Sequence, residues 1–137
     1  MAYNNQKNSK IELGKIELDY EKDEQLFGET AEKWSKQLFQ DSSKTVNNIN
    51  QIRKFYDKVL ELQEKADGIS DNEEYKKKIF PFVIMLKSKA SYAKTRNLVS
   101  DSFVKMINNC VDDAKTIEKM QNFKYFFEAI IGFYPKK

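Results

Sequence analysis

The scarcity of helix breakers is the feature that most constrains how this chain can fold. Four glycines and two prolines occur in 137 residues, whereas a fold of many short strands uses such residues at its turns. Long segments without them, in which apolar residues recur every three or four positions, are typical of helices. The sequence therefore predicts an all-α protein, a compact bundle of about five helices with a real hydrophobic core.

Capping residues and one proline place the expected helix ends. Asn48, Ser100 and Thr116 each precede an apolar helical pattern, where a side-chain oxygen can accept a free N–H group of the first turn. Pro81 interrupts the third helix, because proline lacks the backbone N–H and clashes with the preceding turn. The helices expected cover about 29–40, 48–67, 71–79 continuing after a break or kink as 81–97, 100 onward, and 116–134.

The first 28 residues differ in character from the rest. They are polar and contain two copies of the tetrapeptide Lys-Ile-Glu-Leu, at 10–13 and 15–18. The alternation over 16–20 is compatible with a short strand, but a lone strand is marginally stable. We therefore expect a polar, partly disordered or loosely docked arm over 1–28, followed by a helical domain over 29–137.

The composition argues against catalysis and against a bound metal or cofactor. The chain has no histidine and one cysteine, Cys110, so the commonest general base and the commonest zinc ligands are missing. The adjacent acids Asp112 and Asp113 point about 100° apart on a helix and do not converge on one ion. The sequence predicts a protein that is not an enzyme and that works by binding.

The apolar residues also bear on location. No run of about 18 apolar residues occurs, so the sequence contains no expected membrane span. Residues 1–10 lack the apolar core of a signal peptide, and a single cysteine agrees with a reducing compartment. A cytoplasmic location is expected.

A run without acids is the first indication of a binding surface. Residues 75–100 contain no Asp or Glu, whereas an ordinary solvent-facing helix mixes both signs of charge. A local basic surface of this kind can follow a phosphate backbone, and it can equally serve solubility alone. The cations in this window are Lys76, Lys77, Lys78, Lys87, Lys89, Lys94 and Arg96.

Helical spacing divides these cations into two rows. Lys87 and Lys94 lie on one side of an apolar face, and Lys89 and Arg96 lie on the other, each pair about 10 Å apart along the axis. Such rows can contact phosphates or extend beside a core. Arg53 and Arg96 are the only arginines among 24 cations, and their planar guanidinium groups suit either phosphate or an ion pair between helices. The apolar face is formed by Phe82, Val83, Leu86, Ala90 and Ala93.

The last helix carries more apolar surface than one face of a core requires. One face is formed by Met120, Phe123, Phe127, Ile130 and Tyr134, whereas Tyr125, Phe126, Ala129 and Phe133 lie on another. A helix that is apolar all round is either central or an interface. Tyr125, Phe126 and Phe133 are therefore candidates for contact with another protein.

Three segments resemble those of a known family. Asn50-Gln51-Ile52-Arg53-Lys54 resembles its helix-opening motif, although Asn50 replaces the usual Ser or Thr. The segment 86–96 resembles its basic central helix, and 123–134 resembles its aromatic closing helix. In this order and spacing, the chain is similar, over about 48–134, to the small subunit of type III-A CRISPR–Cas effector complexes, the Csm complexes.

The resemblance implies a function in RNA-guided antiviral defence. It implies a non-catalytic helical subunit whose copies stack along the complex beside the other Csm subunits and contact guide RNA and target RNA through basic residues. No phosphate-binding loop or RNA-recognition motif is present, so contact with the RNA backbone is expected. The alternative is a protein–protein interaction module whose basic face only aids solubility. The RNA-binding residues expected are Arg53, Lys54, Lys87, Lys89 and Arg96, followed by Lys94 and Lys124.

Overall fold

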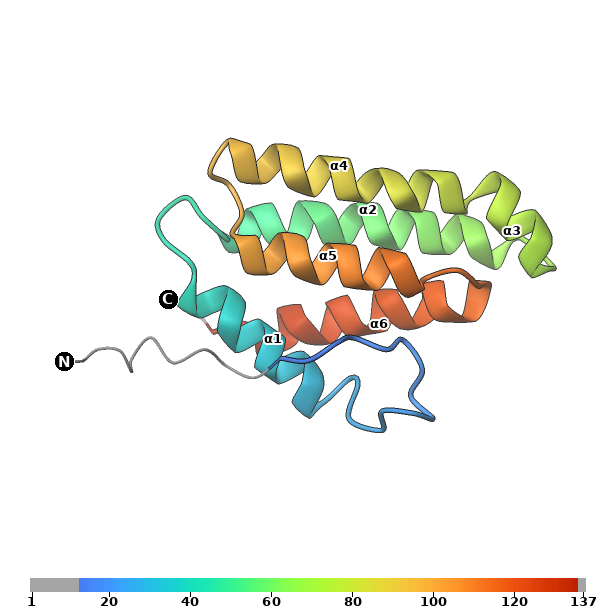
Figure 1. Cartoon of the computed structure of the whole chain (residues 1–137), viewed down its shortest axis with the longest axis horizontal. Helices are drawn as coiled ribbons and strands as arrows, with labels where there is room; N and C mark the ends of the chain where they lie inside the picture. The colour runs from blue at the N-terminus through green and yellow to red at the C-terminus, as the bar shows by residue number, and fades with distance from the viewer. Residues whose placement is uncertain (1–12, 136–137) are drawn as a thin grey trace.

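Six helices make up the part of the chain, residues 13–135, that the computed structural model describes (Figure 1). No strand occurs in these residues, and the predicted all-α fold is confirmed. The predicted count of about five becomes six, because Ile79 separates the third helix into two. The helices are α1 (Glu29–Gln40), α2 (Ile49–Asp67), α3 (Asn72–Lys78), α4 (Phe80–Thr95), α5 (Asp101–Asp113) and α6 (Ile117–Phe133).

The predicted capping residues begin their helices. The side chains of Asn48, Ser100 and Thr116 accept hydrogen bonds from backbone N–H groups in the first turns of α2, α5 and α6. Each bond satisfies a donor that has no partner within the helix. Pro81 lies in the first turn of α4, where its missing N–H group costs nothing. The break expected near this proline is confirmed.

The helices pack around α6. Helices α1 and α2 lie along α6, while α4 lies along α5 and covers the outer side of the bundle (Figure 1). Large aromatic side chains fill the space between them and are fully buried. Burying one such side chain contributes about 1.5–3 kcal/mol. The largest of these are Trp34, Tyr75, Phe103, Phe123, Phe126 and Phe127.

The segment before α1 belongs to the core, and the loosely docked arm predicted for 1–28 is wrong over its second half. Ile16, Leu18 and Leu26 are buried in the main hydrophobic cluster. The backbone N–H of Leu18 donates to the carboxylate of Asp113 at 2.8 Å, and its carbonyl accepts from the amide of Asn122 at 3.0 Å. These side chains satisfy the backbone without a strand, and no strand forms over 16–20. Residues 1–12 lie outside the described part.

Candidate nucleic-acid interface

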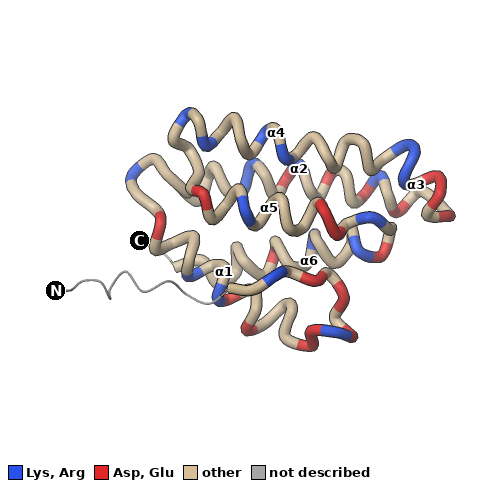
Figure 2. Tube along the Cα trace, viewed as in Figure 1, with Lys and Arg blue, Asp and Glu red and all other residues tan. Residues whose placement is uncertain are grey.

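One face of α4 presents a continuous exposed row of cations and apolar side chains. Its members are spaced three or four residues apart and are all exposed, so they lie one above another on the same side of the helix. Figure 2 shows the cations that recur along this helix without an intervening acid. We call this row the α4 stripe; it consists of Phe82, Met85, Lys89, Tyr92 and Arg96.

The opposite flank of α4 is electrostatically compensated by α5. Lys87 forms an ion pair with Asp112, and the ammonium of Lys94 lies 3.3 Å from the carboxylate of Asp101. Both acids lie outside the acid-free run and reach α4 only through packing of the two helices. Lys87 and Lys94, predicted to bind RNA, are therefore already paired.

The cations of the α4 stripe, unlike Lys87 and Lys94, lie away from the carboxylates of α5. Lys89 and Arg96 are exposed, and neither forms an ion pair with an acid within residues 13–135. A guanidinium nitrogen of Arg96 donates to the hydroxyl of Tyr92 at 3.0 Å, and its central carbon lies 5.5 Å from the centroid of the same ring. This contact holds the guanidinium beside the stripe and leaves most of its N–H groups open to an anion.

Helix α2 brings further cations to the side facing α4. Lys54, Lys58 and Lys65 are spaced four and seven residues apart and share one face of the helix, whereas Arg53 lies about 100° away around the axis. Arg53 and Lys54 are both exposed. Lys54 thus shares its helix face with Lys58 and Lys65, which line a groove together with Lys89 of α4, whereas Arg53 lies outside this face.

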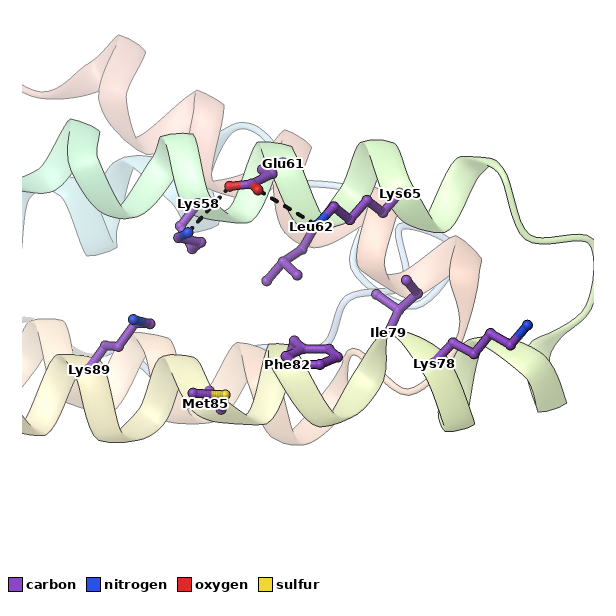
Figure 3. A pocket seen from close by; sticks show the side chains of 9 residues that line it. All are labelled: Lys58, Glu61, Leu62, Lys65, Lys78, Ile79, Phe82, Met85 and Lys89. Atoms are coloured by element: carbon purple, nitrogen blue, oxygen red, sulfur yellow. Dashed lines mark hydrogen bonds and ion pairs between the residues drawn. The ribbon is translucent and has the colours of Figure 1, made fainter.

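A groove separates α2 from the α3–α4 arm, as Figure 3 shows. Its volume is about 290 Å³. The floor is apolar and the edges carry lysines from both sides. The groove is lined by Leu62, Ile79, Phe82 and Met85 and by the charged residues Lys58, Glu61, Lys65, Lys78 and Lys89.

The single acid of this groove is already neutralised. Glu61 lies 3.3 Å from the ammonium of Lys58 and 3.7 Å from that of Lys65. The hydrogen bond from Lys58 and the charges of both lysines lower the pKa of Glu61. The edge therefore retains net positive charge.

The observed exposure corrects one predicted interface residue, Phe126, and one residue predicted to face the core, Phe82. Phe126 is fully buried, so it belongs to the core and is not available to a partner. Phe82, predicted to lie on the buried face, is 56% exposed. The spacing of apolar residues predicted too wide a buried face. Helix α4 packs on the bundle through a narrow face that includes the small residues Ala90 and Ala93, and the adjacent positions face solvent.

Lys124 is a poor candidate for RNA contact. Its side chain is only 17% exposed and lies 3.9 Å from Glu128. The ammonium also lies 4.0 Å from the ring centroid of Tyr125, an arrangement typical of a cation–π contact. These contacts engage the charge within the protein.

An exposed aromatic cluster occupies a different face. Tyr125 and Phe133 are each 41% exposed, in agreement with their assignment as surface residues. Phe27 packs against Tyr125 with ring centroids 5.8 Å apart and against Tyr20 at 6.2 Å. Tyr20 and Phe27 were missed in the sequence, because their segment was assigned to the arm and its folding onto α6 depends on tertiary contacts.

The described residues offer little that resembles a reaction centre. No group of three or more His, Cys, Asp or Glu side chains within them is placed to hold a metal ion. Cys110 is buried, and burial raises the pKa of its thiol well above the usual value, with a smaller contribution from Asp113. None of the described helices is both long and apolar enough to cross a membrane.

These features define a small all-helical protein that presents a basic, partly aromatic exposed face on α4. Comparison with family models identifies it further: the model of the family Csm2 Type III-A matches residues 21–136. The chain belongs to this family, the non-catalytic small subunit of the type III-A CRISPR Csm complex. The match begins well before residue 48, where the resemblance found in the sequence began. Comparisons with curated proteins and with solved structures gave no match.

Proposed function

We propose that this subunit contacts the RNA of the Csm complex through the α4 stripe, with Lys89 and Arg96 as the principal phosphate ligands and Lys54 beside them. The observation that carries the proposal is the contrast between the two flanks of α4. Lys87 and Lys94 face carboxylates of α5, whereas Lys89 and Arg96 are exposed without an acidic partner in the described chain. An unpaired cation gains more from a phosphate than one that must first give up a carboxylate.

The geometry supports contact with the backbone rather than reading of bases by hydrogen bonds. Lys89 and Arg96 are seven residues apart, which is about 10 Å along the helix axis, so they reach different phosphates. Backbone contacts of this kind are independent of sequence and weaken as salt displaces them. A single copy with so few contacts binds weakly, and several copies aligned on one RNA bind with avidity.

The aromatic cluster of Tyr20, Phe27 and Tyr125, together with the more distant Phe133, is the proposed contact with other subunits or with a second copy of the chain. Exposed aromatic side chains grouped in this way are enriched in protein interfaces. This face belongs to α6 and the segment before α1, so it leaves the α4 stripe free for RNA.

The proposal is tested in the assembled complex. Subunits carrying Lys89→Glu with Arg96→Glu are compared with subunits carrying Lys33→Glu with Lys36→Glu, which reverse the same number of charges on the exposed side of α1. Each variant is co-expressed with the other Csm subunits and a CRISPR array, and target-RNA affinity is measured on the purified complex.

The α4 variant is expected to enter the complex and to weaken binding of target RNA, whereas the α1 variant is expected to bind like wild type. Equal affinity of all three complexes would favour the alternative, a protein-interaction module whose basic face only aids solubility. Failure of the α4 variant alone to enter the complex would show that this face binds protein.

A further inference from the structure

The groove between α2 and the α3–α4 arm combines two properties that seldom occur together on a solvated surface. Its floor exposes apolar side chains: Phe82 is 56% exposed and Met85 is 48% exposed. Its edges carry Lys58 and Lys65 on one side and Lys78 and Lys89 on the other (Figure 3). A ligand that fills it must therefore bring an apolar surface and negative charge within a short distance of each other.

The lysines at the edges of the groove differ in how far neighbouring carboxylates neutralise their charge. Lys58 and Lys65 share Glu61, so together they keep one positive charge in excess. Lys78 lies 3.0 Å from Glu74 and is largely compensated. Lys89 has no acidic partner in the described residues, and it is the last residue of the α4 stripe that lines the groove, before Tyr92 and Arg96. The available charge is thus concentrated at the end of the groove next to Tyr92 and Arg96.

We propose that this groove holds an unpaired nucleobase of single-stranded RNA, with the base against Phe82 and Met85 and the adjoining phosphate on Lys89. A nucleotide joins a planar apolar base to an anionic phosphate, which matches the floor and the charged end of the groove. Aromatic side chains stack on any base, so this recognition requires no particular sequence. The inference deepens the proposed function and depends on it, because Phe82, Met85 and Lys89 belong to both the groove and the α4 stripe.

Continuity with the α4 stripe favours RNA over an acidic peptide as the occupant. From Lys89 the row continues through Tyr92 to Arg96, whose guanidinium already lies against the tyrosine ring. This sequence of apolar floor, cation, aromatic ring and cation repeats the alternation of bases and phosphates along one strand. An acidic peptide that filled the groove would not require the aromatic ring and second cation that Tyr92 and Arg96 supply.

The inference predicts a preference for single strands. In a duplex the bases are paired and stacked and cannot enter the groove, so a duplex contacts only Lys89 and Arg96. The full-length chain is titrated, at low salt, with a short single-stranded uridine oligonucleotide and with a blunt RNA duplex of the same total phosphate number. Wild type is expected to bind the single strand more tightly.

Two variants test whether this preference arises from the groove. Phe82→Gln with Met85→Gln removes the floor without changing charge, and Ile84→Gln is the matched control, since Ile84 is 47% exposed on the same helix but does not line the groove. The double variant is expected to lose single-strand affinity by about tenfold, in line with the loss of one stacked base, and to retain duplex affinity. The control is expected to retain both.

Photo-crosslinking of the same full-length chain to 4-thiouridine RNA gives an independent readout, with crosslinks expected on the α4 peptide that contains Phe82 and Met85. Equal losses for single strand and duplex, no loss in the double variant, or crosslinks confined to other helices would overturn the inference while leaving phosphate contact intact. Loss of subunit assembly with RNA affinity unchanged would assign the groove to a protein partner. If wild type binds neither RNA at low salt, the proposed function fails as well.

Discussion

The hydroxyl of Tyr134 donates a hydrogen bond of 2.7 Å to the backbone carbonyl of Asn47, 87 positions earlier in the chain. The Asn47 amide donates to the carbonyl of Leu38 at 2.9 Å and to the hydroxyl of Ser100 at 2.8 Å, and its own oxygen accepts from the Ser100 N–H at 3.0 Å. The backbone N–H of Asn47 donates to Leu98 at 2.9 Å. One buried residue therefore joins the ends of α1, α4 and α6 to the start of α5.

Asn47→Ala is expected to lower the free energy of unfolding by about 2–4 kcal/mol, because buried partners lose their hydrogen bonds and the residue has a left-handed backbone. Its φ is 56°. Asn47→Gly relieves the backbone strain but still loses the side-chain bonds, so its loss should be smaller than that of Asn47→Ala. Urea denaturation measures both. An alanine variant as stable as wild type would show that the four segments are held by packing alone.

The buried phenol of Tyr75 is expected to make the folded protein less stable at alkaline pH. Its side chain is fully buried, its hydroxyl donates to the carbonyl of Ala114 at 2.7 Å, and burial raises the pKa of the phenol above its usual value of 10.0. Between pH 10 and the higher folded-state pKa, the unfolded chain releases this proton and the native chain keeps it. Stability therefore falls as pH rises above about 10.

Tyr75→Phe separates this contribution from those of other groups. Near neutral pH the variant is expected to lose about 1–2 kcal/mol, because the Ala114 carbonyl loses its donor in the core. Above pH 10 the difference in the free energy of unfolding between wild type and Tyr75→Phe should narrow. Wild type loses stability there through ionisation of Tyr75 in the unfolded chain, whereas phenylalanine does not ionise. The measurement is the free energy of unfolding from urea titrations across this pH range. A gap that widens with pH would mean that the phenol ionises more readily in the folded state.

Leu18 tests whether the segment before α1 belongs to the core. Leu18→Ala is expected to cost about 2–5 kcal/mol, the usual range for a buried leucine that leaves a cavity. Glu17→Ala is the control. Glu17 is the exposed neighbour of Leu18, so this substitution should change the free energy of unfolding by no more than about 0.5 kcal/mol. Thermal and urea unfolding report both. Equal stability of the two variants would indicate a segment that rests on the bundle without supporting it.

The helices and their starts could be predicted because their causes are local. Asn48, Ser100 and Thr116 each act on N–H groups two or three residues ahead, and Pro81 acts on the turn that contains it. Local chemistry of this kind is complete within a short window of sequence. The acid-free run over 75–100 likewise includes the whole of α4, the helix on which the RNA contact is proposed.

The predictions that were wrong concern features that depend on tertiary contacts. Whether Lys94 is free depends on Asp101, which lies on the next helix, and no spacing within α4 reveals it. Phe126 is buried because α1 and α2 enclose α6 from several sides, whereas the sequence shows only that α6 is apolar all round. The segment over 16–27 docks because Asp113 and Asn122, far away in sequence, satisfy its backbone.

The central claim is that the α4 stripe, and not the opposite flank of the same helix, contacts RNA. The direct test compares Csm complexes assembled with Lys89→Gln plus Arg96→Gln against complexes assembled with Lys87→Gln plus Lys94→Gln, since both remove two cations from α4. Target-RNA affinity is measured over a series of salt concentrations, because each lost phosphate contact lowers the salt slope by about one.

The account predicts weaker binding and a shallower salt dependence for the first complex, and values close to wild type for the second, whose lysines are paired with Asp112 and Asp101. Equal losses in the two complexes, or a larger loss when Lys87 and Lys94 are replaced, would contradict it.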